Sequence, residues 1–192
     1  MPEARPAPAL LSAYRAVFLD RDGTLVEDPG FLHEPARVRL LPGVAPAVRQ
    51  LNEAGWLVVT VSNQSGIARG VYDATAYTAV QRRLSELLAA HDAHLDGAYF
   101  CPHHPEVSGP CDCRKPGVQL FRDAQAALGI DFAASYWVGD RPSDVLPARA
   151  LGGRGILVST GHGATHRGEA GALGVPVVAD LAAAVDLIVR DR

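Results

Sequence analysis

Two aspartates one residue apart carry the first candidate chemistry in this sequence. Asp20 and Asp22 stand in the run DRDGT (residues 20–24), directly after the apolar residues AVFL. One such carboxylate can attack phosphorus as a nucleophile while the other passes a proton to the departing oxygen. Gly23 lets the chain turn away without a side chain blocking the pocket. An Asp-Gly turn with solvated acids is the alternative, and it fits this run almost as well.

A second cluster, SNQSG at residues 62–66, follows the longest apolar segment. Its hydroxyl, amide and backbone N–H groups, placed before a glycine, are suited to hold the oxygens of a phosphoryl group. A plain strand-to-helix turn would account for the same residues. The cluster therefore points to a phosphate site only in combination with others.

Two further clusters carry opposite charge. Arg114 and Lys115 supply a fixed double positive charge suited to an anionic group, although such a pair is also common on surfaces. The run GDRPSD (139–144) contains Asp140, whose carboxylate could complete a hard-cation site with Asp20. The serine or the second aspartate of this run could also cap a helix, and both roles can hold at once.

All three cysteines of the chain lie within thirteen residues, in the pattern C-x-H-x7-C-x-C. Cys101, His103, Cys111 and Cys113 would form a complete tetrahedral Zn²⁺ set of the structural type. His104 is the alternative imidazole; we favour His103 because its one-residue gap from Cys101 mirrors the gap between Cys111 and Cys113. Cysteines without a metal are the other alternative. A zinc clip would close a long loop with little core of its own and so position the Arg-Lys pair that follows.

The composition limits the classes of function. With 192 residues the chain suits one domain, and a formal net charge of −3 gives no basic excess for nucleic acid. No apolar run reaches the roughly 18 residues of a membrane-spanning helix, and the N-terminus lacks the apolar core of a secretory signal. Three cysteines cannot all pair within the chain, which favours a reducing compartment. We expect a cytoplasmic, monomeric protein that acts on a small phosphorylated sugar, with no nucleic acid or membrane partner.

The clusters must be positioned by alternating strands and helices. Short apolar runs predict buried strands, and amphipathic segments between them predict helices, which indicates right-handed βαβ units. We expect an α/β, Rossmann-like three-layer sandwich with a central, mainly parallel sheet. The expected strands are 16–20, 56–62, 97–101, 135–140 and 155–159, and the expected helices lie near 43–54, 73–90, 117–128, 143–151 and 181–190.

Several local expectations accompany this pattern. Asp73 should cap the second helix, and Pro147 should lie near the first turn of the fourth, where a missing N–H costs least. Residues 1–14 should be a flexible lead-in to a single domain that spans 15–192. GHGATHRG (161–168) should be a flexible loop, because a lone G-x-G is weak evidence for a nucleotide site. Trp56 and Trp137 are expected in the core.

The order of the clusters, Asp-x-Asp-Gly-Thr, Ser-Asn, Lys and Gly-Asp-x-x-x-Asp, resembles the haloacid-dehalogenase superfamily of phosphohydrolases over residues 16–150. The resemblance implies that Asp20 is the nucleophile that becomes an aspartyl-phosphate, and that Asp22 is the general acid and then the base. It implies that Ser62 and Lys115 bind the phosphoryl group. Asp140 would ligate Mg²⁺ together with Asp20 and the backbone carbonyl of Asp22.

The motifs CPHH…CDCRKP and SNQSGIARG together resemble the D-glycero-D-manno-heptose 1,7-bisphosphate phosphatases. This resemblance implies little or no cap domain and removal of the 7-phosphate, a step in making activated heptose for lipopolysaccharide or another glycan. Histidinol-phosphate phosphatases, which share the zinc clip and DRDGT, are the alternative. The loop 104–110 is shorter than the heptose pattern, and Arg141 stands where Lys is common. A non-catalytic zinc and phosphate binding module would require a lost catalytic group, and none is missing.

The residues expected to meet the substrate form a larger set. DPGF (28–31) should form part of the rim that meets the sugar, or else be a solvent-exposed turn. Arg114 should reach the second phosphate of a bisphosphate, or else assist the transferring phosphoryl group. The expected substrate contacts are Asp28, Pro29, Gly30, Phe31, Ser62, Asn63, Gln64, Ser65, Arg114, Lys115 and Arg141.

Overall fold

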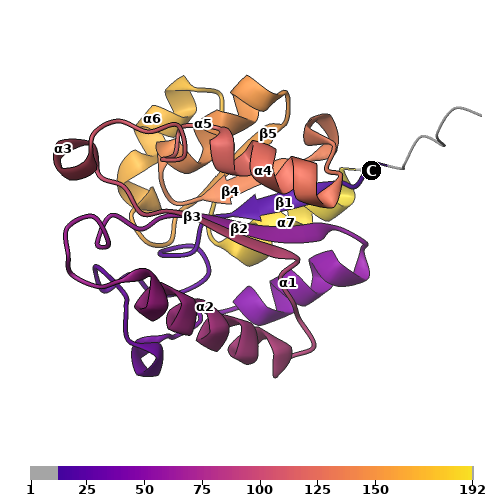
Figure 1. Ribbon diagram of the computed structural model, residues 1–192. Coiled ribbons are helices and arrows are strands. Elements are labelled where there is room, and N and C mark those ends of the chain that lie inside the picture. The colour runs from indigo at the N-terminus through magenta and orange to yellow at the C-terminus, as the bar shows by residue number, and fades with distance from the viewer. Residues whose placement is uncertain (1–12, 192) are drawn as a thin grey trace, which may run out of the picture.

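A six-stranded parallel sheet forms the centre of the protein, in a computed structural model that describes residues 13–191. The strand order is β3-β2-β1-β4-β5-β6, so the chain starts in the middle and winds outward twice (Figure 1). The five predicted strands are confirmed, with every end within one residue of its predicted position; β6 was missed because only two of its residues pair. The bounds are β1 Ala16–Leu19, β2 Leu57–Asn63, β3 Gly97–Cys101, β4 Tyr136–Gly139, β5 Arg154–Val158 and β6 Val177–Val178.

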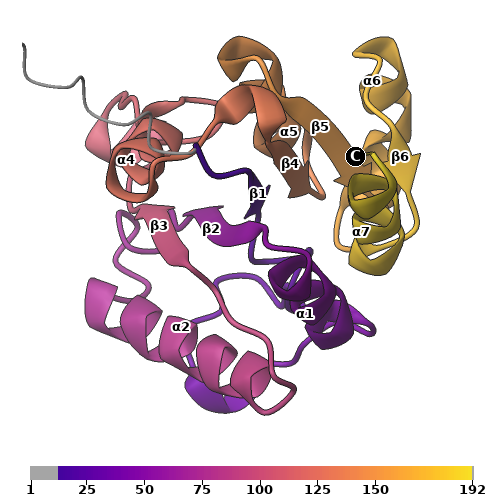
Figure 2. The same ribbon diagram turned by 90° about the vertical axis from the view of Figure 1, so that its right-hand side faces the viewer.

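Helices cover both faces of the sheet, which confirms the predicted three-layer sandwich. α1, α2 and α7 pack on one face and α4 and α5 on the other, while α6 lies beside β6 (Figures 1 and 2). The bounds are α1 Val44–Glu53, α2 Ala74–Ala89, α3 Pro105–Ser108, α4 Gln119–Leu128, α5 Pro142–Leu151, α6 Arg167–Ala172 and α7 Leu181–Arg190, with short 3-10 helices at Pro35–Arg37, Phe132–Ala134 and Gly163–His166.

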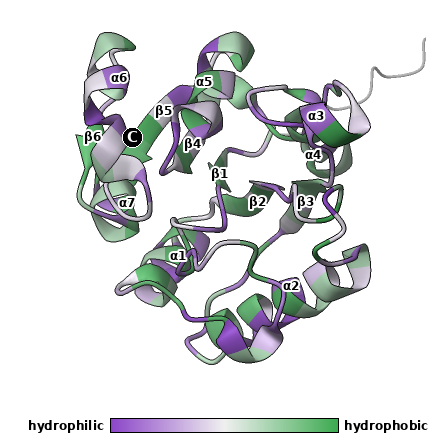
Figure 3. Ribbon diagram, turned by 90° about the vertical axis from the view of Figure 1, so that its left-hand side faces the viewer, coloured by the Kyte–Doolittle hydropathy of each residue, from purple (hydrophilic) through white to green (hydrophobic). Residues whose placement is uncertain are grey.

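The sheet separates two hydrophobic cores. Successive side chains of a strand point to opposite faces, so Val17 and Leu19 of β1 enter the core with α1, α2 and α7, whereas Phe18 enters the core with α4. Phe18 there packs against Trp137 with ring centroids 4.7 Å apart. Both tryptophans are buried, as predicted. Figure 3 shows the corresponding pattern, with hydrophobic strands inside and helices that alternate between polar and apolar residues.

The helix ends agree with the sequence signals except at one proline. Asp73 caps α2 through its carboxylate, which accepts a hydrogen bond from the backbone N–H of Ala76 at 2.8 Å. The placement of Pro147 was wrong: α5 begins at Pro142, which leaves Pro147 in the second turn. The helix starts early because Pro142 suits the first helical position and Asp144 accepts from the backbone N–H of Arg141 at 2.9 Å.

The predicted boundary between a lead-in and the domain, after residue 14, stays a prediction. Residues 1–12 of the expected lead-in fall outside the described residues. Tyr14 exchanges backbone hydrogen bonds with Gly129 and Asp131, at 2.9 Å and 2.8 Å, and is therefore attached to the domain. Within residues 13–191, the helices are too short or too polar to span a bilayer.

The topology brings the ends of four strands together. β3, β2, β1 and β4 are neighbours, so the residues that follow them meet at one edge of the sheet. Open α/β sheets bind their ligands at this carboxyl edge, next to the point where the winding direction changes. The register places Leu19 opposite both Thr60 and Val138. Asp20 thus emerges between the ends of β2 and β4.

Candidate active site

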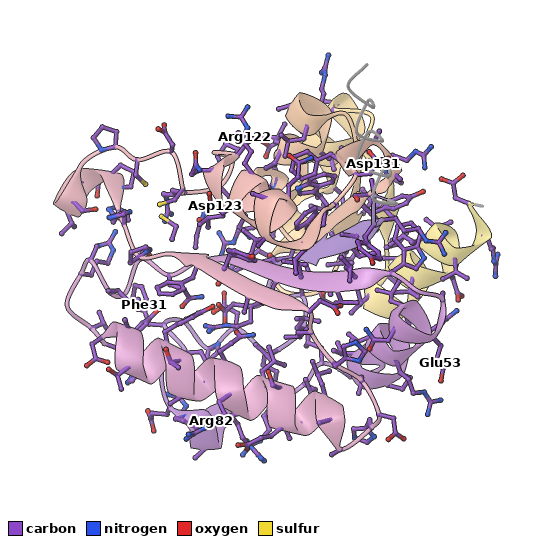
Figure 4. The ribbon with its side chains drawn as sticks, turned by 45° about the vertical axis from the view of Figure 1, so that its right-hand side comes forward. Phe31, Glu53, Arg82, Arg122, Asp123 and Asp131 are labelled. Carbon is purple, nitrogen blue, oxygen red and sulfur yellow. The ribbon has the colours of Figure 1, made fainter. Side chains whose placement is uncertain are left out.

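A cavity of about 450 Å³ opens at this edge of the sheet. Eleven of the predicted site residues line it: Asp20, Asp22, Asp28, Gly30, Phe31, Asn63, Gln64, Ser65, Arg114, Lys115 and Arg141. Figure 4 shows Phe31 on the same side of the molecule as the sulfur atoms of the cysteine loop, with Glu53 on the opposite side. Leu32, Tyr72, Ser143, Asp144 and His162 also line the cavity and were not predicted as substrate contacts.

Three of the residues predicted for catalysis, substrate binding or Mg²⁺ lie outside the cavity lining. Pro29 belongs to the exposed turn beside it. The Ser62 side chain is buried and its hydroxyl accepts a hydrogen bond from Nε2 of Gln64 at 3.2 Å. Asp140 is fully buried and accepts a hydrogen bond from the backbone of His162, a residue that lines the cavity. The role of Ser62 on a phosphoryl group stays a prediction, whereas its contact with Gln64 is a structural fact.

Lys115 is the cation at the centre of the site. It is buried, and its Nζ donates to Oδ1 of Asp20 at 2.7 Å and to the backbone carbonyl of Val61 at 2.6 Å. Nζ also lies 2.8 Å from Oδ1 of Asp144. Burial lowers the pKa of the Lys115 ammonium, but Asp144 and Asp20 outweigh that effect, so the pKa is raised. The side chain therefore remains positively charged beside Asp20 at neutral pH.

Asn63 fixes the backbone of Lys115. The Asn63 amide donates to the carbonyl oxygen of Lys115 at 3.1 Å and accepts from its backbone N–H at 3.0 Å. Because Asn63 is the last residue of β2, this pair of bonds ties the loop after β3 to the sheet. In the predicted Ser-Asn pair, the side-chain amide of Asn63 thus holds the backbone of Lys115, which belongs to the Arg-Lys cluster.

Burial dominates the electrostatics of Asp20. It raises the pKa of the carboxyl group; Lys115 lowers that pKa, and the nearby carboxylates of Asp144, Asp22 and Asp140 raise it further. A cation among these carboxylates would remove the repulsion. The arrangement thus has the electrostatic character of a cation site.

Asp140 supplies a second carboxylate to that candidate cation site. Its Oδ2 accepts from the backbone N–H of His162 at 2.7 Å, whereas its Oδ1 has no hydrogen-bond partner within residues 13–191. Carboxylate oxygens of Asp20, Asp140 and Asp144 lie within 4.8 Å of one another. A buried carboxylate oxygen of this kind calls for a partner, and all-oxygen donors suit Mg²⁺. The residues present therefore fit the predicted ion.

Two glycines keep space open around Asp140. Gly23 has φ +84°, and a Cβ there would lie 2.5 Å from Oδ2 of Asp140. A Cβ on Gly161 would overlap the same oxygen. Gly23 therefore leaves room for the Asp140 carboxylate, and its predicted effect on the pocket itself stays a prediction.

The prediction of a flexible loop at residues 161–168 was wrong. The segment contains the 3-10 helix Gly163–His166 and begins α6. Its first residues pack on Asp140, and a side chain on Gly163 would overlap the carbonyl of Val158. Gly161 and Gly163 therefore serve close packing, which composition alone cannot distinguish from flexibility.

The side chain of Asp22 is held apart from the three clustered carboxylates of Asp20, Asp140 and Asp144. Nη2 of the fully buried Arg21 lies 2.9 Å from Oδ2 of Asp22, and Nε2 of Gln64 donates to the same oxygen at 2.8 Å. Its side chain faces the cavity without joining Asp20 and Asp140. The predicted contribution of Asp22 to metal binding through its backbone carbonyl stays a prediction.

The rim of the cavity contains a small charged cluster. Oδ2 of Asp28 lies 3.5 Å from Nε2 of His162 and 4.0 Å from Nη2 of Arg141. Asp28 also accepts from the backbone N–H of Gly30 at 2.9 Å, and Phe31 is 44% exposed. DPGF thus forms an exposed segment at the edge of the cavity, and its contact with the sugar stays a prediction.

The cysteine loop brings together a complete ligand set. Sγ of Cys101 lies 3.6 Å from that of Cys111 and 2.9 Å from that of Cys113, and Nδ1 of His103 lies 3.2 Å from Sγ of Cys113. With Zn–S bonds of about 2.3 Å, a tetrahedral site places its sulfur atoms about 3.8 Å apart; Cys101 and Cys111 are close to this distance, whereas the sulfur of Cys113 would have to move away from that of Cys101. His104 faces elsewhere, with its Nε2 2.8 Å from Nη2 of Arg69. The group suits one metal ion.

Comparison with known proteins agrees with this geometry. A HAD-hydrolase-like family model matches residues 112–184. The D-glycero-beta-D-manno-heptose-1,7-bisphosphate 7-phosphatase of Yersinia pestis is 45% identical over 163 residues, which cover 82% of this chain and 87% of the relative. The protein of that name from Escherichia coli K12 is 42% identical over 160 residues, 80% of this chain and 84% of the relative.

A solved structure extends the similarity to the fold. The D,D-heptose 1,7-bisphosphate phosphatase from B. bronchiseptica, complexed with magnesium and phosphate, superposes with a TM-score of 0.85 at 33% identity, covering 93% of this chain and 99% of that one. Fold and site together define a hydrolase of the haloacid-dehalogenase class. Within that class, the chain belongs to the D-glycero-β-D-manno-heptose-1,7-bisphosphate 7-phosphatase family.

Proposed function

We propose that this protein is a Mg²⁺-dependent phosphatase that removes the 7-phosphate of D-glycero-D-manno-heptose 1,7-bisphosphate. The observation that carries the proposal is the position of Asp20, at the end of β1 and 2.7 Å from the buried ammonium of Lys115. A nucleophile beside a fixed cation suits an attack on an anionic phosphate ester. The heptose-phosphatase relatives supply the substrate class.

The reaction follows from the two carboxylates. An oxygen of Asp20 attacks phosphorus, the bond from phosphorus to the sugar oxygen breaks, and Asp22 gives its proton to that oxygen. Asp22 then takes a proton from water, whose oxygen attacks the aspartyl-phosphate and releases inorganic phosphate with Asp20 restored. Lys115 faces the charge that develops on the phosphoryl oxygens.

Asp20 and Asp140 would hold Mg²⁺, with the backbone carbonyl of Asp22 as a further ligand. When bound, the ion supplies positive charge between two anions, the nucleophile and the phosphate. Asp144 is committed to Lys115 at 2.8 Å and to the backbone N–H of Arg141 at 2.9 Å. We therefore assign Asp144 to orienting Lys115.

Phosphorus NMR tests the reaction directly. With Mg²⁺, the protein should convert the signal of the C7 phosphomonoester to that of inorganic phosphate, while the anomeric phosphate remains on the sugar. EDTA should stop the conversion, because the carboxylates would then repel the substrate. Release of the anomeric phosphate would contradict the assigned bond. No hydrolysis of any phosphate ester with Mg²⁺ would favour the binding module instead.

Zinc in the cysteine loop is a separate proposal with its own test. The protein as isolated should contain about one Zn²⁺ per chain, and Cys111→Ser should lose it and melt at a lower temperature, because such sites contribute folding energy. His104→Ala is the matched control and should retain zinc, since His104 faces Arg69. A Cys111→Ser protein that keeps its zinc and its melting temperature would show the clip to be wrong.

Arg114 is the best candidate to bind the second phosphate. It lines the cavity, and its Nη1 donates to the backbone carbonyl of His103 at 3.2 Å, so the cysteine loop steadies it. Arg69 lies outside the cavity lining, with Nη2 2.8 Å from Nε2 of His104. Lys115 is committed to Asp20.

Arg114→Ala should therefore raise KM for the heptose bisphosphate more than for the 7-monophosphate of the same sugar. Steady-state kinetics on the two substrates measure the difference, and Arg69→Ala is the control that should leave the ratio unchanged. Equal losses on both substrates would assign Arg114 to the transferring phosphoryl group.

A further inference from the structure

Gln64 stands between Asp22 and a tyrosine that no motif had singled out. Its Nε2 donates to Oδ2 of Asp22 at 2.8 Å, and its Oε1 accepts from the hydroxyl of Tyr72 at 2.5 Å and from Nη2 of Arg21 at 3.1 Å. Tyr72, Gln64 and Asp22 all line the same cavity. The three side chains form a chain of hydrogen bonds that ends on the carboxylate proposed to move protons.

The orientation of the Gln64 amide decides whether the Asp22 carboxylate faces a hydrogen-bond donor or an acceptor. An amide donates from its nitrogen and accepts at its oxygen, so a rotated amide would turn its oxygen toward the carboxylate of Asp22. Two donors, the Tyr72 hydroxyl and the Arg21 guanidinium, hold Oε1 away from Asp22. Burial raises the pKa of Tyr72 to about 12, with Arg21 lowering it and Asp22 raising it. The hydroxyl thus remains a donor at neutral pH.

The ring of Tyr72 is itself fixed by packing. It stacks on His33 with ring centroids 5.5 Å apart and an interplanar angle of 7°. A Cβ on Gly66 would overlap the Tyr72 ring and would lie 2.9 Å from Cδ1 of Phe31. The glycine of the SNQSG run therefore makes room for the tyrosine. The packing of the Tyr72 ring on His33 and Gly66 thus places its hydroxyl beside Gln64, and this packing does not involve the hydroxyl itself.

We infer that Tyr72 is a positioning residue, which acts through Gln64 to hold the carboxyl of Asp22 in place for proton transfer to the leaving sugar oxygen. The inference rests on the proposed function and deepens it. Proton transfer requires the acid within hydrogen-bond reach of the departing oxygen. A sugar alkoxide is a poor leaving group and needs that proton, whereas 4-nitrophenolate departs without it. If Asp22 loses its position, the rate should therefore fall for the sugar substrate and not for 4-nitrophenyl phosphate.

Tyr72→Phe removes the hydroxyl and keeps the ring that packs on Gly66 and His33. Its kcat/KM for heptose bisphosphate should fall about 3- to 10-fold, the range expected for one hydrogen bond, with kcat/KM for 4-nitrophenyl phosphate unchanged. This parameter reports the steps up to leaving-group departure, so slow breakdown of the aspartyl-phosphate does not hide the effect. Tyr99→Phe, which removes a hydroxyl on β3 away from the cavity lining, should change neither value.

A double-mutant cycle separates positioning from a general structural effect. If Tyr72 acts through Asp22, adding Tyr72→Phe to Asp22→Asn should cost nothing further on heptose bisphosphate. Equal losses on both substrates, or a loss that persists beside Asp22→Asn, would overturn the inference while the phosphatase assignment stands. If the wild type fails on heptose bisphosphate yet hydrolyses histidinol phosphate, the proposed function fails, and the same cycle read on histidinol phosphate still decides the role of Tyr72.

Discussion

Asp20→Asn is expected to abolish turnover and to leave the fold intact. An amide cannot attack phosphorus, so no aspartyl-phosphate can form. The fold should survive because Lys115 keeps two partners, the carboxylate of Asp144 at 2.8 Å and the carbonyl of Val61 at 2.6 Å. Steady-state hydrolysis of heptose bisphosphate measures the loss, and circular dichroism with thermal melting checks the fold.

A phosphoryl analogue distinguishes the two carboxylates of the DRDGT run. Beryllium fluoride with Mg²⁺ should give density bonded to Asp20 in a crystal structure, with the Asp22 side chain free of it. Full activity in a folded Asp20→Asn protein, or an adduct on Asp22, would reverse the roles that we assign.

Asp22→Asn should lower kcat/KM for heptose bisphosphate by about 10²- to 10⁴-fold, the usual contribution of a general acid. Asn cannot give a proton to the sugar oxygen, although it keeps nearly the same shape between Arg21 and Gln64. Asp22 is also the proposed base for the second step, so the variant should accumulate aspartyl-phosphate. With 4-nitrophenyl phosphate, stopped-flow absorbance should show a burst of nitrophenolate close to one equivalent per site, followed by slow turnover.

The burst distinguishes a catalytic role of Asp22 from a purely structural one. A destabilised protein would lose amplitude and rate together, and it would lose them on both substrates. Wild-type rates in Asp22→Asn, on the sugar substrate as well as the aryl one, would remove Asp22 from the mechanism.

Three of the four polar clusters could be predicted because each directly follows a buried strand, whereas Arg114 and Lys115 reach the same edge through the cysteine loop after the partly exposed strand β3. Apolar runs give the strands, the βαβ rule makes the strands parallel, and parallel strands collect their carboxyl ends at one edge. Asp20, Asn63, Lys115 and Asp140 therefore meet, and Lys115 contacts Asp20 although 95 residues separate them. The cysteine pattern was equally informative, because its ligand spacing is itself local.

Other parts of the site depend on tertiary packing that no local pattern reports. Tyr72 reaches Gln64 from the turn before α2, and the backbone of His162 reaches Asp140 from the loop after β5. Neither Tyr72 nor His162 belongs to a sequence motif that would mark it as a site residue. Their positions depend on the close packing of Gly66 against Tyr72 and of Gly161 against Asp140. The same cause explains the ordered 161–168 segment. Asp144 could be predicted as a helix cap, and its second contact, with Lys115, appears only in the folded chain.

The identity of the substrate can be tested by comparing three phosphate esters. The wild-type protein with Mg²⁺ should be assayed for phosphate release from heptose 1,7-bisphosphate, histidinol phosphate and fructose 1,6-bisphosphate, with kcat/KM measured for each. We predict that heptose bisphosphate has the highest kcat/KM, because a second phosphate can meet Arg114 at the cavity wall while the first meets Lys115 and Asp20. A higher kcat/KM for histidinol phosphate than for heptose bisphosphate would contradict the assignment.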